Sequence, residues 1–287
     1  MAFEHKYANV NGVRLHYAVC GQGPLILFVH GFPEFWYEWR AQLDEFGRDH
    51  LAVALDTRGY NLSSKPTGVD AYHMKSLVGD LCALAEHLGY HKFVMVGHDW
   101  GGATAWAFAL AHPECLEKLV IINAPHPGVF ARELRDNPAQ QKASQYMLMF
   151  RGEGAESRLS ANNYEALVKA VAGAFTEDDK QAYIEAWSQP GALTGGLNYY
   201  RASRVGPPAP DGTPASGNFG ADPAALTVRV PTLVIWGEKD TALLTGNLEG
   251  LEEYVSDLTV RRIPDGSHWV VHEAPELVNR YIREFLG

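Results

Sequence analysis

The stretch Val94-Met95-Val96-Gly97-His98-Asp99-Trp100-Gly101-Gly102 decides the fold class of this chain. A short apolar run leads into Gly-x-Asp-x-Gly, and an alanine-rich segment with a helical pattern follows. This order predicts a strand, a sharp turn and a helix, the arrangement known as a nucleophile elbow, which raises the central side chain into a pocket. We therefore expect Asp99 to act as a nucleophile.

A carboxylate at this position, in place of the usual serine, restricts the chemistry. Attack on an acyl carbon would give an anhydride, with little gain over the starting ester. Attack on a saturated carbon gives an alkyl ester, which water can later cleave. The sequence therefore predicts a substrate with a tetrahedral carbon and a built-in leaving group, such as an epoxide or a carbon–halogen bond, and disfavours an esterase.

Apolar runs that alternate with helical patterns predict the architecture. Val13–Cys20 alternates like a half-buried strand, and five continuous runs read as buried strands: Leu25–Val29, Leu51–Leu55, Phe93–Val96, Leu119–Ile122 and Thr232–Trp236. Helical patterns lie between several of them, at 74–88 and 103–112, and a last helix is expected at 275–286. This alternation predicts an α/β fold with a mostly parallel central sheet flanked by helices.

The strand pattern stops after Asn123 and resumes at Pro231. Helical stretches at 163–171 and 178–187 replace it, followed by a segment rich in proline and glycine at 205–221 that should be irregular. We expect a core (residues 1–127), an inserted helical cap or lid (128–225) and the second part of the core (226–287). Helices packed on one side of the sheet are the alternative.

Two further segments complete a candidate catalytic set. His30-Gly31-Phe32-Pro33 follows a buried strand, and in α/β hydrolases this loop and the residue after the nucleophile supply the backbone N–H groups of the oxyanion hole, here Phe32 and Trp100. His268, near the C-terminus, is the expected general base, because a neutral imidazole can take a proton from water near neutral pH. Asp240, after the run 232–236, is the expected acid of the triad, and Glu238 is its competitor.

The chain resembles the α/β-hydrolase epoxide hydrolases over essentially its whole length. The matching stretches are 30–40 (HGFPEFWYEWR), 97–102 (GHDWGG), 238–240 (EKD) and 266–269 (GSHW). In that family two cap tyrosines donate hydrogen bonds to the epoxide oxygen, and the resemblance assigns this role to Tyr146 and Tyr200, with Tyr199 as a packing residue. Arg151 departs from the family's usual glutamine. The resemblance implies conversion of an epoxide and water to a vicinal diol through an ester of Asp99.

Two other functions stay open at this stage. Haloalkane or haloacetate dehalogenases use the same aspartate nucleophile, but Phe32, Trp100 and Asn123 stand where those enzymes carry other residues. A catalytically silent ligand-binding protein on the same fold would be expected to lose a member of the triad. The pocket should be apolar, and its candidate lining residues are Trp269, Met147, Met149 and Phe150, besides Phe32 and Trp100.

Net charge and composition restrict the kinds of partner that this chain is expected to bind. The 287 residues carry a formal charge of −10, which excludes nucleic acid as an expected partner. Three scattered cysteines suit a reducing compartment, and no signal peptide or membrane-inserting segment is apparent, so a cytoplasmic location is expected. The expected partners are a small epoxide and water. The chemistry requires no cofactor and no metal, and either a monomer or a homodimer fits.

Overall fold

A single twisted sheet forms the centre of the molecule in the computed structural model, which describes residues 3–171, 175–203, 205–217 and 222–287. The strand order is β1-β2-β4-β3-β5-β6-β7-β8. The strands are β1 (Glu4–Val10), β2 (Val13–Cys20), β3 (Leu25–Val29), β4 (Leu51–Leu55), β5 (Phe93–His98), β6 (Leu116–Ile122), β7 (Thr232–Gly237) and β8 (Leu258–Ile263). β2 pairs antiparallel with β1 and β4, whereas β4, β3, β5, β6, β7 and β8 run parallel to one another.

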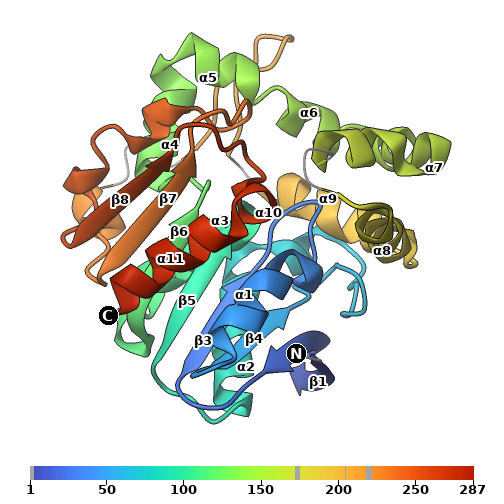
Figure 1. The fold of residues 1–287 in the computed structure, drawn as a ribbon. Helices are drawn as coiled ribbons and strands as arrows, with labels where there is room; N and C mark the ends of the chain where they lie inside the picture. Colours follow the sequence, from blue (N-terminus) through green and yellow to red (C-terminus); the bar gives the residue numbers. More distant parts are fainter. Residues whose placement is uncertain (1–2, 172–174, 204, 218–221) are drawn as a thin grey trace.

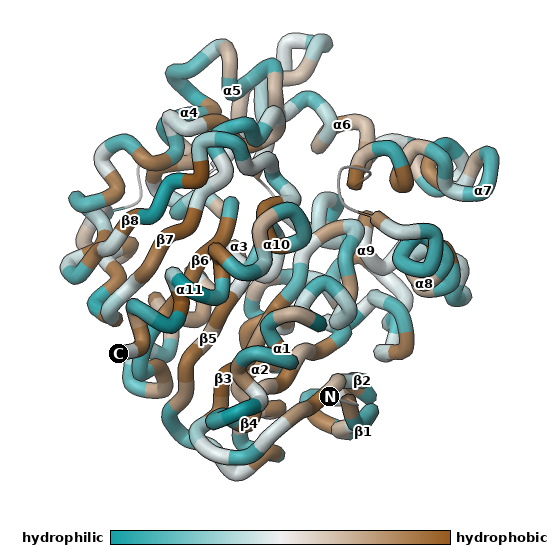
Figure 2. The backbone as a smooth tube through the Cα atoms, viewed as in Figure 1, coloured by the Kyte–Doolittle hydropathy of each residue, from teal (hydrophilic) through white to brown (hydrophobic). Residues whose placement is uncertain are grey.

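Helices cover both faces of the sheet (Figure 1). α1 (Arg40–Phe46) and α11 (Pro275–Leu286) pack on one face, and α2 (Met74–His87) and α3 (Trp100–Ala111) pack on the other. Alternate residues of β3 therefore enter opposite apolar clusters, with Leu27 on the α2/α3 side and Phe28 on the α1/α11 side. Figure 2 shows the inner strands as the most hydrophobic part of the backbone, as expected for strands buried on both faces.

A run of helices separates β6 from β7. These helices are α4 (Pro127–Asp136), α5 (Pro138–Ala143), α6 (Tyr146–Arg151), α7 (Ala155–Val171), α8 (Glu177–Ser188) and α9 (Ala192–Ala202). Figure 1 shows α6 to α9 grouped beyond one end of the sheet, away from the faces that α1, α2, α3 and α11 cover. A separate aromatic-rich cluster, which includes Tyr183, Trp187 and Tyr199, joins these helices to the loops that follow the strands.

Among the short helices, two lie close to the proposed site. The 3₁₀ helix η1 (Trp36–Trp39) leads into α1, and α10 (Val270–Glu273) precedes α11. Both are short, and both lie next to segments that the sequence marks as functional. They place buried polar side chains behind the proposed catalytic histidine.

The predicted fold class is confirmed, and several element boundaries are exact. β2, β3, β4 and α11 coincide with their predicted ranges. The edge strands β1 and β8 were not predicted, because neither contains a continuous buried apolar run. The helix expected at 163–171 is the second half of α7, whose backbone leaves the helical region at 161–164. No helix or strand occupies 205–217, as expected, and 218–221 lie outside the described residues.

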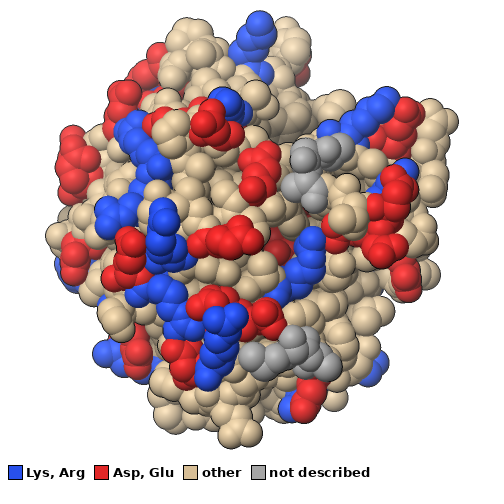
Figure 3. Space-filling model, viewed as in Figure 1, with Lys and Arg blue, Asp and Glu red and all other residues tan. Residues whose placement is uncertain are grey.

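The surface carries charges of both signs. Figure 3 shows acidic and basic side chains intermixed on the face seen there, without a patch of one sign. Within the described part of the chain, no helix combines the length and apolar character needed to cross a membrane.

Candidate active site

Asp99 lies at the turn between β5 and α3, in a backbone conformation that only a tight turn imposes. Its φ and ψ are 51° and −121°, in the left-handed region that a non-glycine residue rarely adopts. Glycines at the turn and in the loop after β3 leave room for it. A Cβ atom on Gly101 would lie 2.0 Å from the backbone oxygen of Val29, and one on Gly31 would lie 2.3 Å from the Asp99 carboxylate. The predicted elbow is therefore present, with Asp99 at its tip.

The three predicted triad residues lie close together in segments that follow strands β5, β7 and β8. His268 Nε2 lies 3.6 Å from Asp99 Oδ2, and His268 Nδ1 lies 2.6 Å from Asp240 Oδ2. Asp240 follows β7, and His268 lies between β8 and α10. The competitor Glu238 instead pairs with Arg262, away from the histidine. Residues 99, 240 and 268 therefore have the mutual geometry of a nucleophile, an acid and a base.

The electrostatics of His268 follow from its carboxylate neighbours. Burial lowers the pKa of His268, but the charge and hydrogen bond of Asp240, with a contribution from Asp99, outweigh burial and raise it to about 9. Burial raises the pKa of the Asp240 carboxyl, yet the charge and hydrogen bond of His268 bring it below its ordinary value. At neutral pH the imidazole is therefore protonated and lies between two carboxylates.

The loop after β3 reaches the nucleophile directly. The backbone N–H of Phe32 donates a 2.8 Å hydrogen bond to Asp99 Oδ1. Trp100 is the first residue of α3, where a helix provides no intrahelical acceptor for the backbone N–H. The two backbone donors expected from the sequence thus come from the loop and the helix that flank the Asp99 carboxylate.

Tyr146 and Tyr200 face the same cavity as Asp99, although they come from two different helices. Tyr146 opens α6, Tyr200 lies near the end of α9, and their ring centroids are 6.1 Å apart. Burial, and then the charge of Asp99, raise the pKa of both phenols above the ordinary value. Both hydroxyls therefore keep their protons at neutral pH and can donate hydrogen bonds.

A cavity of about 540 Å³ connects these groups. Its lining includes Asp99, Trp100, Tyr146 and Tyr200, and most of its other lining residues are apolar or aromatic, among them Met74, Leu77, Ala103, Ala107, Leu110, Phe130, Met147, Leu226 and Leu243. A cavity of this size and character suits a small or medium-sized apolar molecule.

Four of the predicted pocket residues, Met149, Phe150, Trp269 and Phe32, are not among those that line this cavity, whereas Met147 and Trp100 are. Met149 is 46% exposed, because it lies two residues beyond Met147 and so on a different face of α6. Phe150 packs its ring against Phe32, Tyr146 and Tyr200 instead. Trp269 stacks edge-on against His268, outside the lining.

Two residues without a predicted supporting role hold the site in place. Asn123 donates a 2.8 Å hydrogen bond from Nδ2 to Asp240 Oδ2, and its Oδ1 accepts one from the backbone N–H of Gly237. Arg151 donates from Nε to the backbone oxygen of Tyr200 at 2.8 Å, so it links α6 to α9. The position of Asn123 directly after a buried strand was the only sequence signal of its role.

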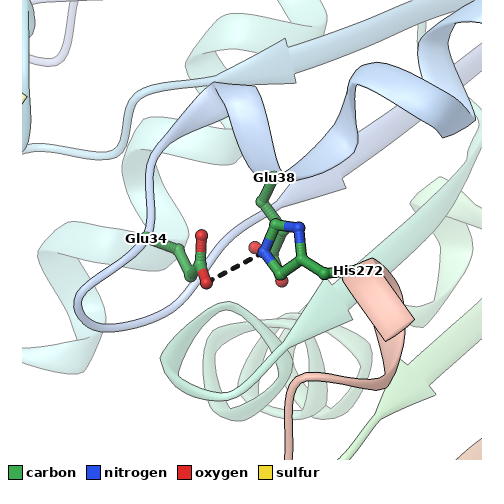
Figure 4. A group of neighbouring side chains, drawn as sticks. All are labelled: Glu34, Glu38 and His272. Carbon is green, nitrogen blue, oxygen red and sulfur yellow. Dashed lines mark hydrogen bonds and ion pairs between the residues drawn. The ribbon is translucent and has the colours of Figure 1, made fainter. Parts of the chain in front are cut away.

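Behind His268 lies a buried cluster that the sequence reasoning missed. Glu34, Glu38 and His272 approach one another there (Figure 4), and each offers a ligand atom within 4.8 Å of the others, a spacing that could hold a metal ion. In the structure, Glu34 Oε1 lies 3.1 Å from His272 Nε2, and Tyr183 donates its hydroxyl to Glu34 Oε2. A metal ion would have to displace these contacts.

Comparison with known proteins agrees with this geometry. The family model described as "alpha/beta hydrolase fold" matches residues 24–275. The chain belongs to the α/β-hydrolase family. Among curated relatives, this hydrolase is 39% identical to the AB hydrolase superfamily protein YfhM of Bacillus subtilis, over 98% of this chain and 97% of the relative. It is 37% identical to Epoxide hydrolase 3 of Xenopus tropicalis, over 99% of this chain and 78% of the relative.

A solved structure gives the same assignment within the family. A crystal structure of the Bacillus megaterium epoxide hydrolase in complex with an inhibitor superposes on this hydrolase with a TM-score of 0.91 at 41% identity. The match covers 98% of this chain and 99% of the other. The hydrolase therefore belongs, within the α/β-hydrolase family, with the epoxide hydrolases.

Proposed function

We propose that this hydrolase converts epoxides and water to vicinal diols through a covalent ester on Asp99. The observation that carries the proposal is the meeting of Asp99 with two phenols, the partly buried Tyr146 and the buried Tyr200, in one apolar cavity. A carboxylate nucleophile suits attack on a saturated carbon. Hydroxyl donors on the opposite side suit a leaving oxygen that develops negative charge. An epoxide supplies both in one small ring.

In the first step, an oxygen of Asp99 attacks an epoxide carbon from the side opposite to the breaking carbon–oxygen bond. The Asp99–carbon bond forms, and the electron pair of the ring bond moves onto the epoxide oxygen. Tyr146 and Tyr200 donate to that oxygen as its charge grows, and one of the phenols then transfers its proton to complete the hydroxyl group. The proton that His268 releases once Asp99 is esterified returns that phenol to its neutral form. The product of this step is a hydroxyalkyl ester of Asp99.

The second step releases the diol. His268, oriented by Asp240, takes a proton from water, and the oxygen of that water attacks the ester carbonyl of Asp99. The backbone N–H groups of Phe32 and Trp100 are the proposed donors to the tetrahedral oxyanion. Esterification removes the negative charge of Asp99, which lies 3.6 Å from His268. The first step thereby favours the neutral imidazole that the second step requires.

The helical segment 128–225 is proposed to serve as the cap of this site. Tyr146 on α6 and Tyr200 on α9 support the proposal, because both side chains line the cavity together with Asp99. The cap would therefore supply the groups that stabilise the leaving oxygen, while the sheet supplies the nucleophile and the base. A cytoplasmic location is also proposed, and its support is the three scattered cysteines alone.

A single turnover in oxygen-18 water tests the covalent route. With enzyme in excess over styrene oxide, the first diol should be unlabelled, and the label should appear in the peptide that contains Asp99. Label in that first diol would refute the ester intermediate. A parallel assay with a haloalkane and fluoroacetate separates the proposal from a dehalogenase. We expect diol formation from the epoxide and no comparable halide release.

A further inference from the structure

The buried cluster behind His268 contains one carboxyl group that the proposed mechanism does not use. Glu38 lies on η1 and is 1% exposed, and His98, the last residue of β5, is fully buried beside it. Neither residue lines the cavity. His98 directly precedes Asp99 in the chain, so any group that fixes His98 also affects the nucleophile elbow.

The neighbouring pair Glu34 and His272 is already balanced in charge. Burial lowers the pKa of His272, but the Glu34 carboxylate outweighs burial and raises it. Figure 4 shows the contact between Glu34 and His272, with Glu38 beside them. Glu34 also accepts a hydrogen bond from the hydroxyl group of Tyr183. The charges of Glu34 and His272 therefore compensate each other without a charge on Glu38.

Glu38 has a different environment. Among the described residues, neither carboxyl oxygen of Glu38 nor Nδ1 of His98 has an aligned hydrogen-bond partner, although Oε1 and Nδ1 lie 2.5 Å apart. An ionised carboxylate so deeply buried and so poorly solvated is costly. Burial, and then the charge of Glu34, raise the pKa of Glu38 well above its usual range.

The tautomer of His98 follows from its other nitrogen. His98 Nε2 lies 2.9 Å from the backbone oxygen of His268, and a carbonyl oxygen only accepts, so Nε2 carries the hydrogen. Burial, and then the charge of His268, lower the pKa of His98 to about 4, so the ring is neutral near pH 7. Its Nδ1 therefore bears a lone pair, and the group that contacts Nδ1 must be a donor.

We infer that Glu38 is a neutral carboxylic acid that donates its proton to His98 Nδ1, and that this pair positions His268 through the backbone oxygen of His268. The inference rests on the proposed role of His268 as the base. The bond from His98 to His268 ties the loop of the base to the elbow of the nucleophile. Without a donor on Nδ1, the hydrogen of His98 can move to that nitrogen, and the contact with His268 then becomes repulsive.

The groups that could alter the protonation of Glu38 come from several elements. They are Glu34 before η1, His98 on β5, Asp99 at the elbow, Tyr183 on α8, His268 after β8, His272 on α10 and, farther out, Arg40 on α1. Asp99 and Glu34 both disfavour a further negative charge at Glu38, whereas His268 and His272 favour one. The experiment must therefore report the charge of Glu38 directly.

Two substitutions at one position separate a neutral donor from a charge. In Glu38→Leu the donor is lost, and we expect ester hydrolysis to slow about tenfold to a hundredfold, the range seen when partners of metal-binding histidines are removed. In Glu38→Gln the neutral amide can donate to His98 Nδ1, so most of the lost rate should return. Gln42→Leu is the matched control, because it removes a buried polar side chain whose amide contacts Asn279 instead. The rate constants of ester formation and of ester hydrolysis should both be unchanged in that control.

Spectroscopy tests the protonation state without relying on turnover. The infrared spectrum of the unmodified protein at neutral pH should contain a protonated-carboxyl band that Glu38→Gln lacks. Nitrogen-15 NMR should show His98 as the neutral Nε2–H tautomer. If Glu38→Leu does not fold, Glu38→Gln and these spectra still decide the question.

Three results would overturn the inference. The first is a Glu38→Gln enzyme as slow as Glu38→Leu, with a lowered pKa of His268, because that outcome reports the loss of a negative charge. The second is the absence of the carboxyl band. The third is a stoichiometric divalent metal that Glu38→Gln loses. A protein that forms no ester with any epoxide would instead refute the proposed function, and the spectra would still report on Glu38.

Discussion

Removal of the Asp99 charge should lower the pKa of His268, and the structure sets the size of the effect. His268 Nε2 lies 3.6 Å from Asp99 Oδ2. At this separation two unit charges attract by about 5 kcal/mol at an effective dielectric constant of about 20, and by about 1 kcal/mol in bulk water. One pH unit corresponds to about 1.4 kcal/mol, so Asp99→Asn should lower the pKa of His268 by about one to three pH units.

The sign follows from the charge of each form. The Asp99 carboxylate favours the imidazolium, and its removal must therefore favour the neutral imidazole. From about 9 in the unmodified enzyme, the pKa should fall in Asp99→Asn, while Asp240 continues to hold it above the value that burial alone would give. Because the ester of Asp99 is also uncharged, the same change should occur during turnover. The pH profile of ester hydrolysis should then report a pKa below 9.

NMR titration of enzyme labelled in the histidine rings measures this pKa. His268→Gln identifies the resonance, and intact mass confirms that position 99 remains asparagine. Asp265→Asn is the control, because that carboxylate is exposed and pairs with Lys239. An unchanged or raised pKa of His268 in Asp99→Asn, with the control unaffected, would refute the reasoning that the two groups are electrostatically coupled.

Two further predictions concern the chemical steps. His268→Gln should still form the ester but not hydrolyse it, so intact mass should rise by the mass of one epoxide, and the absence of an adduct would place the base elsewhere. Tyr146→Phe and Tyr200→Phe should each slow ester formation by about a hundredfold, as loss of an oxyanion donor does, or about 3 kcal/mol. Stopped-flow measurement of ester formation checks this, with Tyr254→Phe as a control outside the cavity. A normal rate in the double variant would contradict the role of the phenols.

The sequence located the proposed catalytic groups because they follow strands. Asp99, Asp240 and the loop at Phe32 each come directly after a buried apolar run, and the carboxyl ends of parallel strands meet at one edge of a sheet. Chain order then identified His268. The edge strands β1 and β8 gave no comparable signal, because neither contains a continuous buried apolar run.

The lining of the pocket could not be derived in the same way. Met147 and Met149 are two residues apart and chemically identical, yet only Met147 faces the cavity. The rotation of α6 about its axis decides this, and packing against α9 fixes that rotation through contacts such as the bond from Arg151 to Tyr200. A pattern of apolar residues in a six-residue helix is too short to define a face.

The amino-acid sequence by itself determined the elbow, the order of nucleophile, acid and base, and the alternation of strands and helices, since each depends on residues close together in the chain. Tertiary structure alone decided that Asn123 supports Asp240 and that Glu38 contacts His98 next to His268. Those contacts join segments that are distant in the chain. The protonation states of Asp240, Glu38 and His98 depend on burial. These side chains become buried only once the sheet and the helices have packed together.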